Sequence, residues 1–311
     1  MEKIELKFRS SCDACDIRYV KYLPNGKIKA ILQIAHGMRE FIDRYEEFAV
    51  FLCNNGYLVV GNDHVGHGGS VNSQDDWGFF PGEDGNRTLL DDVYKLTTII
   101  KSEYPNVPYF IMGHSMGSFY VRQYICEHGN EVDGAIIMGT GHQPLTMLKS
   151  GMTACKLFAT GKGWKYRSRA IHRMIFGQYN KRIKNAKTGA EWLTKDYDVI
   201  NYYINEPRCT FKFTLNGYYN MFKGMSRLHN VNLLNNIPKD LPILFVSGQE
   251  DPVGDYGDGV LAAVKSIKDV GCKNIETILY PNDRHEILNE ADKDIVYSDI
   301  LNWLNDKIKW H

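Results

Sequence analysis

A serine between two glycines, at the junction of an apolar run and a helical pattern, is the feature that most constrains this chain. The apolar run covers residues 109–112, and Ser115 follows it between Gly113 and Gly117. A buried strand that turns at once into a helix strains the serine backbone, and a Cβ at either glycine would collide with neighbouring backbone. The pattern favours a nucleophile elbow with Ser115 as nucleophile, although alone it also fits a structural turn. The rest of the chain must therefore supply a base, an acid and an oxyanion hole.

The bulk properties are those of a globular protein. With 311 residues, the chain could form one large α/β domain or two ordinary ones. The N-terminal residues show no apolar run after a basic segment, and no stretch approaches a transmembrane span, so we expect neither a signal peptide nor a membrane anchor. The seven cysteines are an odd number scattered along the chain, which favours reduced thiols. We expect a cytoplasmic protein.

Strand and helix patterns alternate on both sides of an interruption. Before the interruption, we expect strands at 4–9, 16–22, 28–35, 57–60, 109–112 and 135–138, and helices at 44–55, 87–104 and after Ser115. After it, we expect strands at 242–247 and 275–280, and helices at 260–270 and 293–309. The alternation predicts an α/β fold with a mostly parallel sheet covered by helices. Residues 1–141 and 237–311 would form the core, and residues 142–236 an inserted cap.

A serine hydroxyl needs a neighbouring imidazole to take its proton. Among ten histidines, only His285 lies in the loop between the last expected strand and the last expected helix. Loops after parallel strands share the sheet edge that carries the elbow, so His285 can reach Ser115. The carboxylate that orients this base should follow the preceding strand, where Glu250 and Asp251 stand. We prefer Asp251, because Pro252 restricts its local chain, and keep Glu250 as the alternative.

Ester or amide cleavage creates an oxyanion that needs two backbone N–H donors. The residue after the nucleophile, Met116, should provide one donor. The loop after an early strand carries His36, Gly37 and Met38, and the N–H of Met38 is the second candidate. Gly37 would let the backbone approach the substrate without a side chain in the way. A simple turn at the end of the strand is the alternative for this motif.

The sequence indicates no cofactor. His64 and His67 have the spacing of a metal pair but no adjacent third ligand, so we expect these imidazoles to hold loop backbone. Cys12 and Cys15 lack a second pair, which argues against a metal site there. Nucleotide-binding glycine motifs are absent, and we expect neither a nucleotide nor a nucleic-acid partner.

Together these motifs resemble the α/β-hydrolase superfamily, and more closely its bacterial monoacylglycerol lipase and lysophospholipase branch. The resemblance rests on the segments 35–38 with 44–45, 63–70, 113–117, 248–251 and 285–286. It implies an eight-stranded sheet with a lid, and it gives Ser115, Asp251 and His285 the roles of a catalytic triad. It also implies an oxyanion N–H at Met38. Serine at 115, where dehalogenase relatives carry aspartate, favours an acyl-enzyme.

The segment 142–236 combines large apolar residues with positive charge. It holds 16 basic and four acidic residues, a formal charge of +12, whereas the rest of the chain carries −12. Apolar side chains over a serine site suit an acyl chain, but they also suit the core of a lid. Basic residues among Trp, Phe and Met fit transient contact with an anionic membrane, here its inner face, and equally a solvated basic surface.

These observations favour a serine hydrolase that cleaves monoacylglycerol, lysophospholipid or similar single-chain esters. A small-acyl esterase, a thioesterase or an aminopeptidase could use the same triad. An aminopeptidase should offer acidic residues to hold an amine, and the cap segment has few. A non-catalytic binding protein with this fold is the remaining alternative. The sequence does not indicate the oligomeric state.

Overall fold

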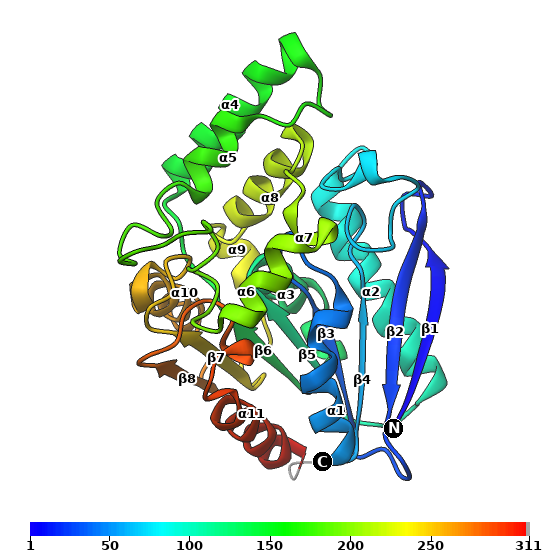
Figure 1. The fold of residues 1–311 in the computed structure, drawn as a ribbon. Helices are drawn as coiled ribbons and strands as arrows, with labels where there is room; N and C mark the ends of the chain where they lie inside the picture. The colour runs from blue at the N-terminus through cyan, green and yellow to red at the C-terminus, as the bar shows by residue number, and fades with distance from the viewer. Residues whose placement is uncertain (309–311) are drawn as a thin grey trace.

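Eight strands form one sheet in the order β1-β2-β4-β3-β5-β6-β7-β8. The structure is a computed structural model and describes residues 1–308 (Figure 1). The strands are β1 Glu2–Arg9, β2 Asp16–Leu23, β3 Ala30–Ala35, β4 Tyr57–Asn62, β5 Tyr109–His114, β6 Gly134–Met138, β7 Ile243–Gly248 and β8 Ile275–Tyr280. β2 pairs antiparallel with β1 and β4, and all other neighbours are parallel. The predicted mostly parallel eight-stranded sheet is confirmed.

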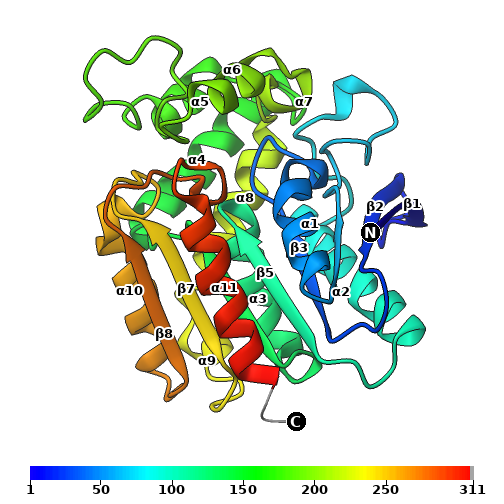
Figure 2. The same ribbon diagram turned by 60° about the horizontal axis from the view of Figure 1, so that its bottom comes forward.

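Helices cover both faces of this sheet (Figure 2). Those of the core are α1 Glu46–Asn54, α2 Gly85–Glu103, α3 Met116–His128, α10 Asp258–Lys268 and α11 Lys293–Ile308. Alternate strand residues point to opposite faces, so Ile31 and Ile111 join the core with α2, α3 and α10. Their neighbours Leu32 and Met112 join the core with α1 and α11. A sheet buried on both faces explains the near-continuous apolar runs of the strands.

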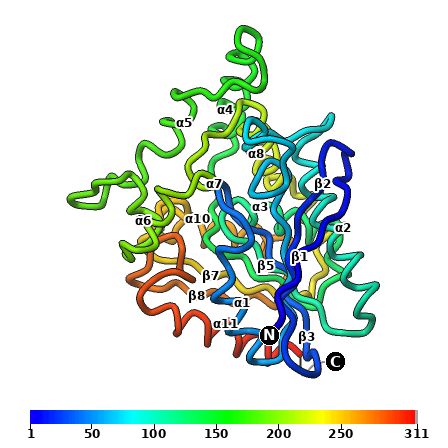
Figure 3. The backbone as a smooth tube through the Cα atoms, turned by 45° about the vertical axis from the view of Figure 1, so that its right-hand side comes forward, coloured from blue at the N-terminus to red at the C-terminus, as the bar shows by residue number. Residues whose placement is uncertain are grey.

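Six helices lie between β6 and β7. They are α4 Leu145–Lys162, α5 Arg169–Phe176, α6 Tyr197–Asn205, α7 Pro207–Thr210, α8 Leu215–Arg227 and α9 Val231–Leu234. Figures 1 and 3 show α4 to α7 beyond the carboxyl ends of the parallel strands, with part of α4 projecting outward. The helix α4 packs along α8, and Leu148 and Phe222 of these helices belong to the main core.

Several expected boundaries differ from the structure by a few residues, and two of the differences concern the segments that flank the loop after β3. The strand expected from residue 28 begins at Ala30, since the preceding residues form the connection from β2. The helix expected at 44–55 divides into a 3₁₀ turn, Ile42–Tyr45, and α1. Tyr45 has φ −97° and ψ 6°, and this non-helical backbone separates the two pieces. The expected end of the last helix, at residue 309, lies outside the described residues.

Candidate active site

Ser115 lies at the tight turn between β5 and α3, and this turn forces its backbone into unusual dihedral angles. Its φ is 53° and its ψ is −119°, a strained combination for a residue with a side chain. A Cβ on Gly113 would lie 2.4 Å from the carbonyl oxygen of Gly117, and one on Gly117 would lie 2.0 Å from that of Ala35. Both glycines are therefore required by close backbone approach, as the elbow pattern predicted.

His285 and Asp251 meet at the same edge of the sheet. The Nδ1 atom of His285 lies 2.8 Å from Oδ2 of Asp251, and both side chains are buried. The other carboxylate oxygen of Asp251 accepts the N–H of Val253 at 2.8 Å, which fixes the carboxylate on its loop. Glu250, the alternative acid, instead forms an ion pair with Lys195 at 3.0 Å.

Aromatic rings enclose the imidazole of His285. The ring of His114 lies 4.7 Å from it and the ring of Trp192 lies 5.0 Å from it, as measured between centroids. The backbone N–H of His285 donates to the carbonyl of Trp192, so the segment between β6 and β7 helps to place the histidine loop. Trp192 is a contact that sequence reasoning missed, because no local pattern links it to a residue 93 positions away.

The backbone of the loop after β3 runs close to Ser115. A Cβ on Gly37 would lie 3.0 Å from Cβ of Ser115, so the absence of a side chain there keeps the approach to the serine open. The N–H of Gly37 donates to Oε1 of Glu40, and Met38 lines the cavity next to the serine. Met116 is the first residue of α3, where backbone N–H groups have no partner within the helix.

A buried ionic network, which sequence reasoning missed, lies beneath this loop. Oε1 of Glu40 accepts hydrogen bonds from Tyr45 Oη at 2.8 Å and His114 Nδ1 at 3.0 Å. Arg44 donates to Oε2 of Glu40 at 3.0 Å and to both oxygens of Glu286 at 2.7 Å. The sequence held one signal for this network: both Arg44 and Glu286 belong to motifs of the resemblance. If such charged residues are buried, their charges must be neutralised by one another.

The charges of this network reinforce one another. Burial alone would lower the pKa of His114, but the adjacent carboxylate of Glu40 outweighs burial and raises it. Burial would raise the pKa of Glu40, and His114 and Arg44 hold it well below its usual range. The other nitrogen of His114 lies 3.2 Å from the carbonyl of His285. His114 thus links Glu40, next to the loop after β3, to the loop that carries His285.

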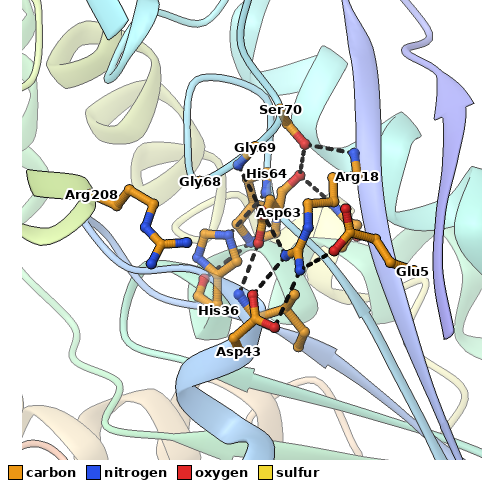
Figure 4. A network of polar contacts seen from close by, with 12 residues as sticks. Glu5, Arg18, His36, Asp43, Asp63, His64, Gly68, Gly69, Ser70 and Arg208 are labelled. Carbon is orange, nitrogen blue, oxygen red and sulfur yellow. Dashed lines mark hydrogen bonds and ion pairs between the residues drawn. The ribbon is translucent and has the colours of Figure 1, made fainter. Parts of the chain in front are cut away.

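Asp63 holds the loop of residues 63–70, which is one of the segments of the resemblance, as Figure 4 shows. Its buried carboxylate accepts from the backbone N–H groups of Ile42 and Gly69 at 2.9 and 2.8 Å, and from Arg18 at 3.2 Å. A Cβ on Gly68 would lie 2.2 Å from this carboxylate, so the loop closes tightly around it. Asp63 therefore has a structural role and lies away from the serine cavity lining.

His64 and His67 hold backbone, as predicted. Nε2 of His64 lies 3.0 Å from the carbonyl of His36, and Nδ1 of His67 lies 3.3 Å from the carbonyl of Val65. The backbone N–H of His64 also donates to Nε2 of His36 at 2.9 Å. These contacts tie the loop after β4 to the loop after β3, which carries the candidate oxyanion donor Met38.

Ser115 and His285 both line a cavity of about 300 Å³. The remaining lining is mostly apolar and comes largely from the segment between β6 and β7: Met147, Leu148, Ile175, Phe176, Tyr179, Trp192, Leu193, Tyr203, Met221, Phe222 and Met225. The lining also includes three acidic residues. Glu40 and Glu286 are both engaged by Arg44, and Asp255 is exposed. The cavity thus offers an apolar chain more contact than it offers an amine.

The sheet order, the strained elbow and the cavity over the carboxyl edge define an α/β-hydrolase of the lipase and esterase type. The chain belongs to the family described as serine aminopeptidase S33, whose model matches residues 26–292. It is 26% identical to a monoglyceride lipase homolog of Monkeypox virus, over 94% of this chain and 96% of that protein. It is 24% identical to a monoacylglycerol lipase of Mycolicibacterium smegmatis, over 93% and 92% of the two chains.

A solved structure gives the same picture of the fold. A thermostable carboxyl esterase from Bacillus coagulans, in complex with glycerol, matches with a TM-score of 0.91 and 29% identity over 99% of both chains. The match extends through the helices between β6 and β7, since it leaves almost none of this chain uncovered. Among residues 1–308, no helix combines the length and the apolar character needed to cross a membrane.

Proposed function

We propose that this protein hydrolyses carboxylic esters of single-chain lipids, such as monoacylglycerols or lysophospholipids, through an acyl-enzyme on Ser115. One observation carries the proposal: His285, which is hydrogen-bonded to Asp251, borders the same apolar cavity as the strained serine. The names of the relatives, two of which are monoacylglycerol or monoglyceride lipases, support the same substrate class.

In the proposed mechanism, His285 takes the proton of the Ser115 hydroxyl while that oxygen attacks the ester carbonyl carbon. Asp251 holds Nδ1–H of the imidazole, so that Nε2 is the basic nitrogen. The oxyanion accepts hydrogen bonds from the N–H groups of Met38 and Met116. His285 then returns the proton to the departing alcohol. Water, deprotonated by the same imidazole, releases the acid and restores Ser115.

The cavity supports an apolar acyl group as the bound part of the substrate. Its volume of about 300 Å³ is at the small end of the range for ligand pockets, which suits one chain rather than two. We assign the cap to residues 142–236, because this segment supplies most of the apolar lining. Thioesters and short-chain esters are the alternatives that share this machinery, and an amine substrate would meet only the exposed carboxylate of Asp255.

Turnover of p-nitrophenyl esters and monoacylglycerols, from short to long acyl chains, tests this function. We expect a preference for medium or long chains, and we expect Ser115→Ala to lower kcat by about 10³-fold or more. Exposed Ser102, on the far part of α2, provides the matched control, and Ser102→Ala should keep full activity. A fluorophosphonate that labels wild type but not Ser115→Ala would support the acyl-enzyme. Folded wild-type protein that neither reacts nor turns over any ester would refute it.

We further propose that the outer end of α4 contacts anionic membranes. Leu157 and Phe158 are 69% and 42% exposed there, next to exposed Trp164 and the basic residues Lys156 and Lys162. Exposed apolar groups among lysines suit an interface that holds lipid, where each basic group near an anionic surface contributes about 1 kcal/mol.

Flotation with liposomes measures this contact. We expect binding to anionic but not to neutral vesicles, and weaker binding of the double variant Leu157→Ser with Phe158→Ser. Leu261 on α10 is also half exposed but lies outside the cap, so Leu261→Ser is the control that should bind like wild type. Equal and negligible binding to both vesicle types would rule out the membrane contact and leave the ester hydrolysis proposal untouched.

A further inference from the structure

Arg122 is a fully buried arginine in the middle of α3. It lies two helical turns after Ser115, and its side chain is 1% exposed. Arginine is almost never buried to this extent unless an acid pairs with it. The guanidinium also keeps its charge at neutral pH, because burial lowers the pKa of Arg122 only to about 10.

The partners of Arg122 leave most of its charge uncompensated. Nη1 donates to the carbonyl of Gly141 at 2.9 Å and, more weakly, to Oγ1 of Thr140 at 3.4 Å. The Nε and Nη2 atoms are buried and have no hydrogen-bond partner among residues 1–308. No carboxylate in that range forms an ion pair with the guanidinium. An unpaired buried charge of this kind is costly, whereas carbonyl and hydroxyl dipoles neutralise it only in part.

A small cavity adjoins this guanidinium. The centre of a water-sized probe can occupy about 10 Å³ in it, which is room for a single small occupant. His142, Gln143 and His229 line it together with apolar side chains of α3, α4 and α8, and no acidic residue takes part. Nε2 of Gln143 donates to the carbonyl of Val253 at 3.0 Å, which fixes this amide at the border of the cavity, and its Oε1 is buried without a partner among residues 1–308.

We propose that this cavity is a binding site for one monovalent anion of about the size of chloride, held by Nε and Nη2 of Arg122. A halide or a water molecule could accept from both free donors, but only a halide would also neutralise the charge of the guanidinium. This ligand differs from the lipid substrate of the proposed function, and the inference does not depend on that function.

The site is coupled to the substrate cavity by shared walls. Phe119, His142, Gln143 and Leu148 line both spaces. An anion that fixes Arg122 also fixes the loop after β6, because Thr140 and Gly141 accept from the same guanidinium. We therefore expect the anion to stabilise the folded chain and the floor of the substrate cavity.

Thermal unfolding at constant ionic strength tests the proposal. Gluconate, which is too large for the cavity, is replaced stepwise by chloride or bromide. The Tm of wild type should rise saturably, by about 2–4 °C. Arg122→Met replaces the guanidinium by an uncharged side chain of similar length, so its Tm should not depend on the halide. Arg9→Met removes an exposed arginine on β1 and should respond like wild type. A wild-type Tm that does not depend on the halide, or a response that persists in Arg122→Met, would overturn the site.

A crystal of wild-type protein soaked in bromide provides a measurement that needs no variant. Anomalous scattering should show one bromide beside the guanidinium of Arg122, within about 3.5 Å of its nitrogens. If Arg122→Met does not fold, this measurement decides the question. A well-ordered guanidinium with a water molecule in the cavity and no anomalous peak would overturn the proposal.

Discussion

The imidazole of His285 lies 2.8 Å from the carboxylate of Asp251, although 34 residues separate them in the chain. Both belong to loops that follow neighbouring parallel strands, β8 and β7, and the sheet brings the two loops together. The neighbouring carboxylate of Glu250 points to Lys195 instead. Glu250 and Asp251 are adjacent in one turn, and the structure of this turn decides which of the two carboxylates meets His285.

This difference between adjacent acids leads to a direct comparison of two variants. Asp251→Asn keeps the shape of the side chain but favours the wrong tautomer of His285, so kcat should fall by about 10⁴-fold. Glu250→Gln removes the exposed ion pair with Lys195 and a longer one with Arg284 at 3.8 Å, and it should retain activity within about twofold. Ester turnover of the two purified variants checks this, with circular dichroism to verify folding. If Glu250→Gln lost more activity than Asp251→Asn, Glu250 would be the orienting acid.

Glu40→Gln should destabilise the protein in a pH-dependent way. The folded-state pKa of Glu40 is depressed, so its stabilisation is present above its ordinary pKa of 4.5 and fades as pH falls below that value. The pKa of His114 is raised, so its stabilisation is present below 6.5 and fades as pH rises through the raised value. The Tm gap between wild type and variant should therefore be largest between about pH 5 and 6.5.

In Glu40→Gln, buried His114 loses the carboxylate that pairs with it. We expect this loss to lower the free energy of unfolding by about 3 kcal/mol. Glu47→Gln is the control, because Glu47 is exposed and pairs with Lys293 at the surface. Its Tm should differ little from wild type at any pH. A Glu40→Gln variant with a Tm gap that does not change between pH 4 and 9 would contradict the ionic pairing.

Gly117→Ala should prevent correct folding or destabilise the chain by about 3 kcal/mol or more. The added Cβ would lie 2.0 Å from the carbonyl oxygen of Ala35, so that β3 and α3 would have to move apart. Gly161 on α4 is the matched control, because a Cβ there meets nothing within 4 Å. Gly161→Ala should stabilise the protein by up to about 1 kcal/mol. Urea denaturation measures both, and equal effects would refute the close approach.

Asp283→Asn should stabilise the protein at alkaline pH. Burial and the charges of Asp292 and Glu290 raise the pKa of Asp283 to about 7, so the folded state holds a proton that the unfolded state releases near pH 4. The stability contributed by this proton is fully present below pH 3.8 and is lost as pH rises through about 7. We expect the Tm of the variant to exceed that of wild type at pH 8 by roughly 2 °C, and the difference to shrink toward pH 5.

Thermal scans from pH 5 to pH 8.5 check this expectation. Asp240 is exposed, and Asp240→Asn should leave the pH dependence of wild type unchanged. If Asp283→Asn lowered the Tm at pH 8 as much as at pH 5, the carboxyl group would have a different role, such as a hydrogen bond that asparagine cannot replace.

The strands and core helices could be predicted from the sequence because their signals are local. A buried parallel strand is a short apolar run, and a surface helix shows a stripe at helical spacing, so all eight strands were found within a few residues of their bounds. The helices α4 to α9 were not assigned individually, because their apolar residues serve both the core of the segment and the cavity wall. The sequence does not show whether an apolar residue packs in the core of this segment or lines the cavity.

The chain order of the proposed nucleophile, acid and base can be read directly from the sequence. The glycines that permit the elbow could also be predicted from it, since they depend on backbone geometry within a few residues. Only the tertiary structure decided which acid meets His285, how Glu40 joins His114, and that Arg122 is buried without an acid. These contacts join side chains from loops and helices far apart in the chain. Their energy comes from burial and from neighbouring charges, and both exist only after the sheet and helices have packed.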